Sequence, residues 1–306
     1  MPASQFLLFN PINGALTVWD PGEGAAGFRD LGRLDLKITA QPLIGDLNGD
    51  GHDDVYLRPD GWLDLSGQSY TMHGVPPLGP LIERLEVTVD AFGIVQTTLT
   101  TYRDLGEPLF VGDVENGSEA ELVVITASGL LALNSVTSTG GRTTFAPLPS
   151  ASWRPIAVAD LVGDAKGDVV TMNMATRQLT AFNFTESTPG YSGGINLLRL
   201  EEDWALTFSG DFNGDGRDEL LFQNVMTGAV VSWDVAGGAD GFTNQPAVSE
   251  NWHILGTGDL NADGREDIVM GSYLERRAVA WTGMDFIDVS PIIAGGLQLL
   301  GIGHFG

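Results

Sequence analysis

The chain has 306 residues, and 40 acidic against 15 basic side chains give it a net charge of −25. A surface this acidic repels the phosphates of nucleic acids and of anionic lipids, so we expect no nucleic-acid partner and no membrane insertion. Cysteine is absent, which excludes disulfide bonds and catalysis through a thiol.

The composition favours an all-β chain. The sequence contains 41 glycines, and short runs of β-forming residues alternate with turns of Gly, Asn, Asp and Pro. Residues Met1–Asp20 show no basic segment followed by an apolar core, so no signal peptide is visible. No apolar run reaches the ~20 residues that a membrane-spanning helix needs.

The first predicted elements are two apolar strands of a hairpin within Gln5–Asp20. The phrase DLNGDGHDD follows at Asp46–Asp54, after an apolar strand that ends near a glycine. Two segments with alternating apolar residues, Leu85–Asp90 and Val95–Tyr102, then predict a hairpin over residues 85–102. This hairpin has no counterpart elsewhere in the chain, so we treat it as an extra element.

The same phrase recurs four more times. Two copies are degenerate, DVENGSEAE at Asp113–Glu121 and DLVGDAKGD at Asp160–Asp168. Two are complete, DFNGDGRDE at Asp211–Glu219 and DLNADGRED at Asp259–Asp267. The first residues of the five copies lie 67, 47, 51 and 48 residues apart, and the extra hairpin accounts for the longest interval. An apolar strand precedes each copy and a hairpin follows it, which indicates a repeated sheet unit.

The two ends of the chain share a sixth unit. Leu299–Gly306 matches the strand before Asp259, with His304 in place of the first aspartate, and Gln5–Asp20 matches the hairpin that follows a complete copy. We therefore predict one β-propeller domain over residues 1–306, with six blades and a ring closed by pairing the N- and C-terminal strands in one blade. The blades begin near residues 46, 113, 160, 211 and 259, and the split blade combines 304–306 with 1–45. An open row of hairpins or a β-sandwich would not need split ends.

The phrase D-x-N-x-D-G-x-x-D places side-chain oxygens at positions 1, 3, 5 and 9 and a backbone carbonyl at position 7. A glycine at position 6 lets the chain turn sharply, and hard oxygen ligands at this spacing suit Ca²⁺. We predict three calcium sites, with the ligands Asp46, Asn48, Asp50, His52 (carbonyl) and Asp54; Asp211, Asn213, Asp215, Arg217 (carbonyl) and Glu219; and Asp259, Asn261, Asp263, Arg265 (carbonyl) and Asp267. The loops are not EF-hands, because position 12 lacks the bidentate glutamate.

The degenerate copies keep only part of this ligand set. Asp160, Asp164 and Asp168 occupy positions 1, 5 and 9, but Val162 replaces the asparagine, which makes this loop a fourth candidate site. In the Asp113 copy a glycine replaces the acid at position 5, so we expect no ion there. We expect the ions to be structural, because they neutralise clustered acids and fix a turn between two strands.

These loops, the strands that precede them and the LLFQN-type strand that follows resemble FG-GAP/VCBS repeats, the calcium-loop blades of integrin α-subunit propellers and of fungal and bacterial propeller lectins. The resemblance covers nearly the whole chain outside Leu85–Tyr102. It implies structural calcium in the loops and partners bound on blade faces or between blades. The best-known rings of this family have seven blades, so seven is the alternative to six. Loops with few ligands suit affinities of roughly 10⁻⁴–10⁻³ M, which predicts an extracellular or cell-surface location.

Tryptophans recur in register with the loops. Trp153, Trp204 and Trp252 each precede a loop aspartate by seven residues, and Trp233 and Trp281 each follow one by 22. An exposed indole can stack on a sugar ring, and a repeated indole can equally fill the space between blades. We expect packing between blades to be the main role of these tryptophans. The candidate ligand-binding residues are Trp153, Trp204, Trp252 and His253.

Two functions remain open from the sequence. The first is lectin-like carbohydrate binding or adhesion, which the register of the tryptophans favours. The second is a protein–protein scaffold without sugar binding, which the extra hairpin favours. We identify no catalytic residue and expect no enzyme, because the histidines lack an HExxH spacing and no GxSxG turn occurs. A polysaccharide-active enzyme with a carboxylate pair is the alternative, because acids are abundant.

Overall fold

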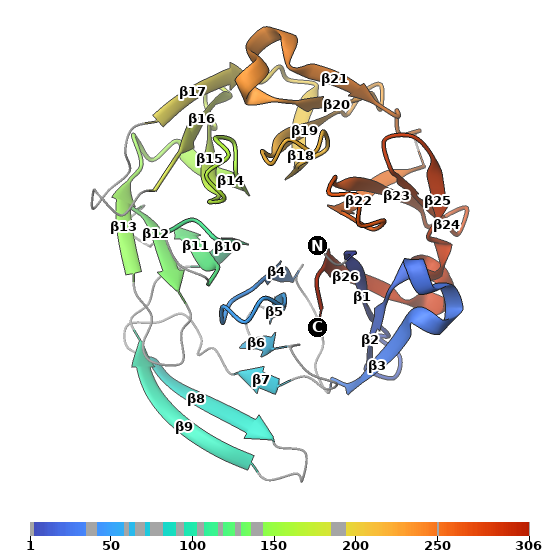
Figure 1. Ribbon diagram of the computed structural model, residues 1–306. Helices are drawn as coiled ribbons and strands as arrows, with labels where there is room; N and C mark the ends of the chain where they lie inside the picture. Colours follow the sequence, from blue (N-terminus) through green and yellow to red (C-terminus); the bar gives the residue numbers. More distant parts are fainter. Residues whose placement is uncertain are drawn as a thin grey trace.

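The computed structural model describes residues 3–34, 42–57, 61–64, 71–73, 82–89, 95–102, 107–115, 119–125, 130–135, 143–184, 194–249 and 251–305. Six antiparallel sheets stand around a common axis, each with its first strand innermost (Figure 1). This arrangement confirms the all-β propeller with six blades that the repeats predict. None of the helices among these residues has the length and apolar character needed to cross a membrane.

We number the blades from the one that contains both ends of the chain, and give their strands from the axis outward. Blade 1 comprises β26 (Gln298–Gly303), β1 (Gln5–Phe9), β2 (Ala15–Trp19) and β3 (Phe28–Arg33). Blade 2 comprises β4 (Leu43–Gly45), β5 (Asp54–Leu57), β6 (Gly61–Asp64) and β7 (Thr71–His73). Blade 3 comprises β10 (Glu107–Gly112), β11 (Glu121–Ile125), β12 (Leu130–Ser135) and β13 (Thr143–Pro147).

The other three blades follow in chain order. Blade 4 comprises β14 (Trp153–Ala159), β15 (Asp168–Asn173), β16 (Gln178–Phe182) and β17 (Gly194–Arg199). Blade 5 comprises β18 (Trp204–Gly210), β19 (Glu219–Asn224), β20 (Val230–Trp233) and β21 (Phe242–Gln245). Blade 6 comprises β22 (His253–Gly258), β23 (Asp267–Ser272), β24 (Arg277–Trp281) and β25 (Phe286–Asp288). Three 3₁₀ segments join strands, η1 (Pro21–Gly27), η2 (Val235–Asp240) and η3 (Ser290–Gly296).

The hydrophobic core is divided among the contacts between neighbouring blades. One buried cluster, for example, joins Val170 of blade 4 to Leu220 of blade 5, and another joins Phe6 of blade 1 to Val269 of blade 6. A third joins Leu7 of blade 1 to Val55 of blade 2. A lone blade would expose these faces, so each sheet is stable only when it is stacked on its neighbours.

The innermost strands approach one another closely because glycines lie between them. A Cβ atom at Gly112 of β10 would lie 2.5 Å from Val158 of β14, and one at Gly301 of β26 would lie 2.4 Å from Ile44 of β4. The second of these contacts joins the last strand of the chain to blade 2, which brings blade 1 against its second neighbour. The innermost strands thus touch in succession all the way round (Figure 1).

A backbone hydrogen bond crosses every boundary between blades at the same place. The carbonyl oxygen of the residue at position 1 of each loop accepts a hydrogen bond from the residue at position 8 of the next loop. In the complete loops, for example, the Glu266 N–H donates to the Asp211 oxygen at 2.7 Å. At the split blade, Asp53 donates to His304 at 2.8 Å, and Ser4 donates to Asp259 at 2.6 Å.

Blade 1 joins the two ends of the chain as the sequence predicts, because β26 pairs antiparallel with β1. The segment after β26 is also held in place. Phe305 is 1% exposed and packs in the core between blades 1 and 2, and Arg29 Nη2 donates to the Phe305 carbonyl oxygen at 2.6 Å. The Asp53 carboxylate accepts a hydrogen bond from the His304 N–H at 2.7 Å.

The extra segment between the first two loop copies forms β8 (Ile82–Val89) and β9 (Val95–Tyr102), which pair with each other. β8 also pairs with β7, so blade 2 becomes a six-stranded sheet whose last two strands extend beyond the ring (Figure 1). The turn at residues 90–94, where the sequence places the tip of this hairpin, lies outside the described residues.

The contact of Phe305 with the split blade gives a test of ring closure. We expect Phe305→Ala to lower the free energy of unfolding by about 3–5 kcal/mol, as for other buried Phe→Ala changes. Phe286→Ala, at a phenylalanine that is 55% exposed, is the matched control and should cost much less. Urea denaturation of both variants measures the difference, and equal losses would show that the C-terminal residues do not stabilise the ring.

Candidate metal centre

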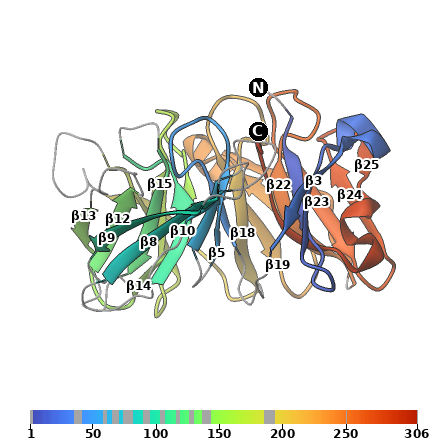
Figure 2. The same cartoon turned by 90° about the horizontal axis from the view of Figure 1, so that it is seen from below.

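The five acidic loops follow the innermost strands of blades 2 to 6 and lie on one face of the ring, the same face as the two chain ends (Figure 2). We call this the loop face. Each loop connects an innermost strand to the second strand of its blade, so its ninth residue is also the first residue of that second strand. The fold therefore places equivalent loop positions at equivalent places around the axis.

The first aspartate folds its loop through hydrogen bonds to the backbone. Asp211 Oδ1 accepts from the N–H groups of Gly214 and Asp215, and Oδ2 accepts from Gly216 at 2.8 Å. Gly214 and Gly216 adopt φ angles of 81° and 83°, which glycine tolerates without strain. The same bonds form around Asp46.

The ninth residue of each loop is a buried carboxylate. One oxygen accepts a hydrogen bond from the backbone N–H at position 2, as Asp267 Oδ2 does from Leu260 at 2.9 Å. The other oxygen, Oδ1, is buried without a hydrogen-bond partner in Asp267 and in Asp168, and both residues are 0% exposed. A buried carboxylate oxygen without a donor is costly, and a cation in the loop would remove that cost.

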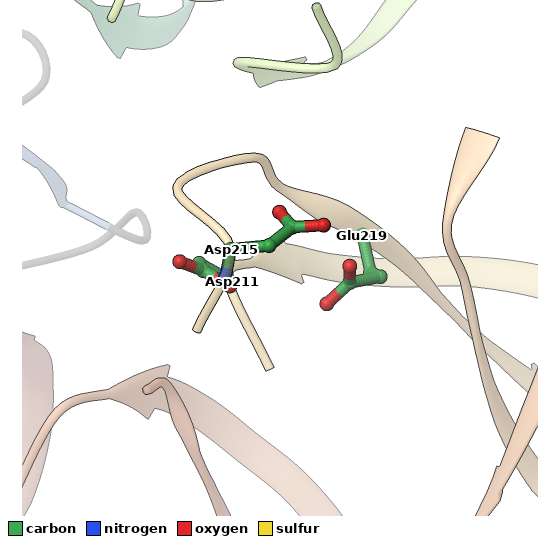
Figure 3. Close-up of side chains that lie close together, drawn as sticks. All are labelled: Asp211, Asp215 and Glu219. Atoms are coloured by element: carbon green, nitrogen blue, oxygen red, sulfur yellow. Dashed lines mark hydrogen bonds between the residues drawn. The ribbon is translucent and has the colours of Figure 1, made fainter. Parts of the chain in front are cut away.

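The Asp211 loop brings its acids closest together. Carboxylate oxygens of Asp211, Asp215 and Glu219 lie within 4.8 Å of one another (Figure 3). Among the described residues no other three acids or histidines gather this tightly. Glu219 has one more methylene than the aspartates at position 9 elsewhere, which extends its carboxylate further into the loop.

The asparagines at position 3 lie among the same carboxylates. Asn213 Nδ2 donates to Asp215 at 3.3 Å and also to Glu219, while Asn261 Nδ2 donates to Asp263 at 3.0 Å. Each amide thus turns its positive end toward the acids. A metal ligand at this position would use the amide oxygen instead, which the same side chain offers after a flip.

Burial raises the pKa of these carboxyl groups. The pKa of Glu219 rises to about 7, mainly because burial removes water, and Asp211 and Asp215 add repulsion. The pKa of Asp267 also rises to about 7, again mainly through burial. Near neutral pH these acids are therefore only partly ionised without a counter-charge, and a divalent cation favours their ionised form.

The acids at position 8 are not among the predicted ligands, and the structure shows that they contact the neighbouring blade. Asp218 Oδ2 accepts from the Asp160 N–H at 2.8 Å, so it bonds across the boundary between blades 5 and 4. Burial raises the pKa of Asp218 to about 6 and that of Glu266 to about 8. The available signal was the acid at position 8 of every complete copy, which the ligand pattern left unused.

The basic residues at position 7 reach the preceding loop. A Cβ atom at Gly163 would lie 2.9 Å from the Arg217 side chain, and one at Gly214 would lie 3.1 Å from the Arg265 side chain. We predicted ligands from the carbonyl groups of these arginines, and their side chains lie against the next loop round the ring.

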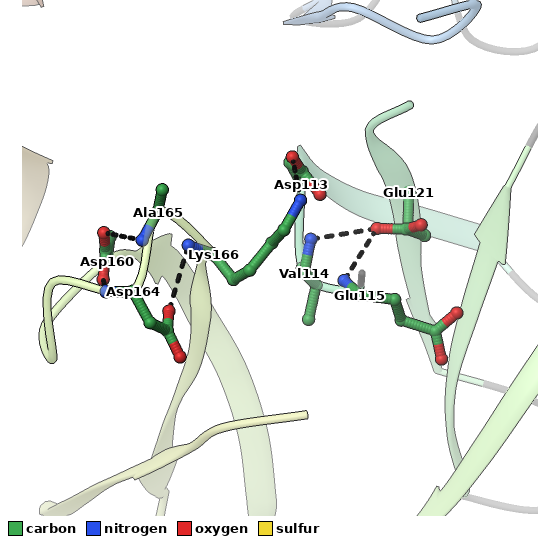
Figure 4. Close-up of polar contacts among 8 residues, drawn as sticks. All are labelled: Asp113, Val114, Glu115, Glu121, Asp160, Asp164, Ala165 and Lys166. Carbon is green, nitrogen blue, oxygen red and sulfur yellow. Dashed lines mark hydrogen bonds and ion pairs between the residues drawn. The ribbon is translucent and has the colours of Figure 1, made fainter. Parts of the chain in front are cut away.

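The degenerate Asp113 loop shows the closest contact of this kind. Lys166, at position 7 of the Asp160 loop, places Nζ 2.6 Å from Asp113 Oδ2 (Figure 4). Glu121 Oε2 accepts hydrogen bonds from the Val114 and Glu115 N–H groups at 2.9 and 3.2 Å. The position that Gly117 occupies in the sequence lies outside the described residues. An ammonium group thus contacts the first acid of a loop that lacks the acid at position 5.

The Asp160 loop keeps the backbone fold of the complete copies despite Val162. Asp160 accepts hydrogen bonds from Gly163, Asp164 and Ala165, and Ala165 takes a positive φ of 61° at the position where all three complete copies have glycine. Asp164 Oδ2 also accepts from Asn183 Nδ2 at 3.0 Å.

The tryptophans divide into two groups by position. Trp233 is 6% exposed, donates through Nε1 to the Gly238 oxygen and stacks on Phe242, and it belongs to the buried cluster between blades 4 and 5 at the loop-face end of β20. Trp204 and Trp252 are partly buried in clusters between blades, and Trp252 Nε1 donates to Glu275 at 3.1 Å. The candidate ligand-binding residues Trp153, Trp204, Trp252 and His253 all lie at the start of innermost strands, on the face opposite the acidic loops.

No protein-family model matches the sequence, and no curated protein matches it. Several solved structures have a similar fold. A protein from Lactobacillus plantarum shows 11% identity and a TM-score of 0.49, with all of both chains covered. The WD40 domain of SCAP from fission yeast shows 9% identity and a TM-score of 0.44, covering 95% of this chain and 80% of its own. A candidate 6-phosphogluconolactonase from Bacteroides uniformis shows 12% identity and a TM-score of 0.45, covering 94% and 82%.

The expectation of no enzymatic activity is contradicted by this comparison. Two of the similar structures, the one from Bacteroides uniformis and another from Bacteroides fragilis, are described as candidate 6-phosphogluconolactonases. At 12% and 10% identity the likeness transfers no substrate or reaction to this chain.

The raised pKa of Glu219 makes the metal-free protein sensitive to pH. The pKa is about 4.5 in the unfolded chain and about 7 in the fold, so between these values the folded state keeps a proton that the unfolded state has lost. Stability should therefore fall as pH rises from about 4.5 to 7. In chelator, Glu219→Gln should unfold at a higher temperature than the natural protein at pH 8, and the difference should shrink toward pH 5.

In millimolar calcium the natural protein should instead unfold at a higher temperature than Glu219→Gln, because the ion stabilises the natural loop more than the loop of the variant. Glu202→Gln, at an exposed glutamate outside the loops, is the matched control and should change neither result. Thermal denaturation followed by circular dichroism measures all three proteins. A variant that gains as much from calcium as the natural protein would contradict a role of Glu219 in cation binding.

The contact between Lys166 and Asp113 can be measured with a double-mutant cycle. Lys166→Met should lower the free energy of unfolding by about 1–2 kcal/mol, since the pair is partly exposed and solvent screens it. Lys166→Met combined with Asp113→Asn should cost less than the sum of the single changes. Additive losses in urea denaturation would show that the ammonium group does not stabilise this loop.

Proposed function

We propose that this chain is a calcium-stabilised recognition module of the FG-GAP/VCBS type that works outside the cell. One observation carries the proposal, namely that acidic loops in register end in carboxylates that the fold buries. Asp267 and Asp168 each keep an oxygen without a hydrogen-bond partner, and Asp211, Asp215 and Glu219 gather within 4.8 Å. Oxygen-only ligands of this kind suit Ca²⁺.

In each complete loop the carboxylates at positions 1, 5 and 9 and the amide oxygen at position 3 would hold the ion. When bound, the ion supplies positive charge that replaces the hydration lost by the buried acids. The Asp160 loop is a fourth candidate, because Asp160, Asp164 and Asp168 lie on the same backbone turn. The Asp113 loop is not, because Lys166 already pairs with its first acid.

The location outside the cell follows from the number of ligands in each loop. Four side chains and one carbonyl group form a smaller set than the six to eight oxygens that Ca²⁺ prefers, so water must complete the shell. Affinities of roughly 10⁻⁴–10⁻³ M follow for such loops, and only a calcium-rich exterior keeps them filled.

Carbohydrate is the ligand class that we propose first. Trp204 and Trp252 line equivalent boundaries between blades and keep part of their surface exposed, as sugar-stacking residues require. Next to Trp252, His253 is exposed and Glu275 holds the indole N–H, so polar groups flank an aromatic surface. Repetition around a ring would allow several weak sugar contacts to act together.

A protein partner is the second candidate, and the hairpin β8–β9 supports it. These two strands extend blade 2 beyond the ring, and β9 ends the sheet. An edge strand offers backbone donors and acceptors to an extended peptide. Such an interaction would be confined to one blade, unlike the repeated tryptophans.

A glycan array tests the first candidate. We expect binding in calcium, a loss of signal in chelator as the loops destabilise, and at least a tenfold loss for Trp252→Ala. Trp233→Phe, at the loop-face end of β20 and away from this surface, is the matched control and should retain binding. Silence on glycans, together with capture of a protein partner that deletion of residues 82–102 abolishes, would replace carbohydrate by protein recognition.

A further inference from the structure

The face of the ring opposite the loop face carries four turns of one geometry. They connect the second and third strands of blades 1, 4, 5 and 6, at Asn10–Gly14, Asn173–Arg177, Asn224–Gly228 and Ser272–Arg276. In the first three, the asparagine carbonyl accepts a hydrogen bond from the fifth residue at 2.7–2.8 Å. The fifth residue of all four has positive φ, between 54° and 74°. The turns are therefore fixed by their own backbone.

Each of these turns presents an apolar side chain at its tip. Ile12 is 86% exposed, Met174 57%, Met226 75% and Leu274 77%. Val225 and Tyr273, beside two of these residues, are 64% and 57% exposed. The four blades are consecutive around the ring, so the tips form one curved row, which we call the apolar arc (Figure 1). Rigid turns do not fold such side chains back into the core.

Charge is distributed unequally between the two faces. In blades 4, 5 and 6 the acidic loops lie at the opposite ends of innermost strands of six or seven residues (Figure 2). At ~3.3 Å per residue these strands separate the loops from the arc by roughly 20 Å. That distance is about twice the screening length of roughly 10 Å at 0.1 M salt. The net charge of −25 therefore says little about the potential at the arc.

Arginines accompany the apolar tips. Arg276 and Arg277 follow Leu274 and are exposed, and Arg199 is exposed next to the turn of blade 4, where its Nε donates to the Thr176 oxygen. Among the described residues, the exposed acids Glu201–Asp203 precede the innermost strand β18 and so lie nearer the axis than the tips. Glu275 is also exposed and lies in the turn of blade 6, where its carboxylate accepts a hydrogen bond from Trp252 Nε1. The outer part of the face thus combines apolar tips with the guanidinium groups of Arg199, Arg276 and Arg277, which outnumber the carboxylate of Glu275.

We propose that the apolar arc docks on a phospholipid surface. Separate apolar tips enter the boundary between headgroups and acyl chains without a complementary shape, because lipids rearrange around them. The neighbouring arginines then lie at the level of the lipid phosphates, whose charge they complement. A protein partner would instead need a pit for each tip, spaced as the blades are. The acidic loop face would point away from the membrane.

Co-sedimentation with vesicles tests this docking. Vesicles of phosphatidylcholine alone and with added phosphatidylglycerol are both expected to bind the natural protein, the second more tightly and with greater sensitivity to salt. Met226→Ser combined with Leu274→Ser should reduce binding at least tenfold. Met284→Ser is the matched control, because Met284 is 84% exposed but lies in the turn between β24 and β25 at the loop face.

Binding should persist in chelator at a temperature where circular dichroism shows the fold intact. Binding that disappears in chelator would assign it to calcium bridges between lipid phosphates and the loop face, and would overturn the proposal. An equal loss for Met284→Ser would also overturn it, as would no binding to either vesicle. Sedimentation velocity without vesicles tests whether a second copy of this chain occupies the arc instead. A dimer that is lost in the double variant Met226→Ser, Leu274→Ser would assign the arc to that second copy and overturn the proposal.

Discussion

The structure depends on a hydrogen bond that crosses each boundary between blades, from the N–H at position 8 of one loop to the carbonyl at position 1 of the preceding one. In four of the six boundaries the residue that accepts this bond is also the aspartate whose carboxylate folds its loop, namely Asp46, Asp160, Asp211 and Asp259. Loop conformation and ring assembly therefore share one residue in each of blades 2, 4, 5 and 6. Anything that orders the carboxylate of Asp211, for example, also positions the carbonyl that Glu266 contacts.

The loops neutralise their buried carboxylates in different ways. Buried carboxylates near neutral pH need positive charge or a proton, and the pKa values near 7 of Glu219 and Asp267 show that the fold alone supplies too little. In the Asp211 and Asp259 loops the amide of the asparagine at position 3 provides part of it. In the Asp113 loop a lysine provides a full charge at 2.6 Å. A loop can thus lose its ligand set and still be retained as a turn.

Sequence periodicity predicted the blades well because each loop copy marks the same point of a repeated sheet. The split blade was predictable for the same reason, since His304 takes the place of a loop aspartate and β26 pairs with β1. Ligand spacing could not predict the roles at positions 7 and 8, because these depend on the neighbouring blade. Arg217 against Gly163 and Asp218 on Asp160 are contacts between residues about 50 positions apart, which no local pattern encodes.

The turns of the apolar arc show a further limit of composition. Averaged over the chain, charge argued against lipid, yet the fold separates acids from apolar tips by the length of a strand. Ile12 and Met226 are ordinary apolar residues in the sequence, and only the alignment of four turns on one face makes them a surface. An exposed apolar residue therefore forms part of a larger surface only where the equivalent residues of neighbouring blades are also apolar and exposed.

The pairing of β1 with β26 also determines the order in which the molecule can assemble. β1 leaves the ribosome early, whereas its inner partner begins at Gln298, and at about 5–20 residues per second the delay is roughly 15 to 60 seconds. During that time the inner edge of β1 has no native partner, although blades 4 and 5 can already stack on each other. Final closure is thus a long-range event that follows synthesis of the other five blades, and until then the open edge of β1 is exposed to mispairing.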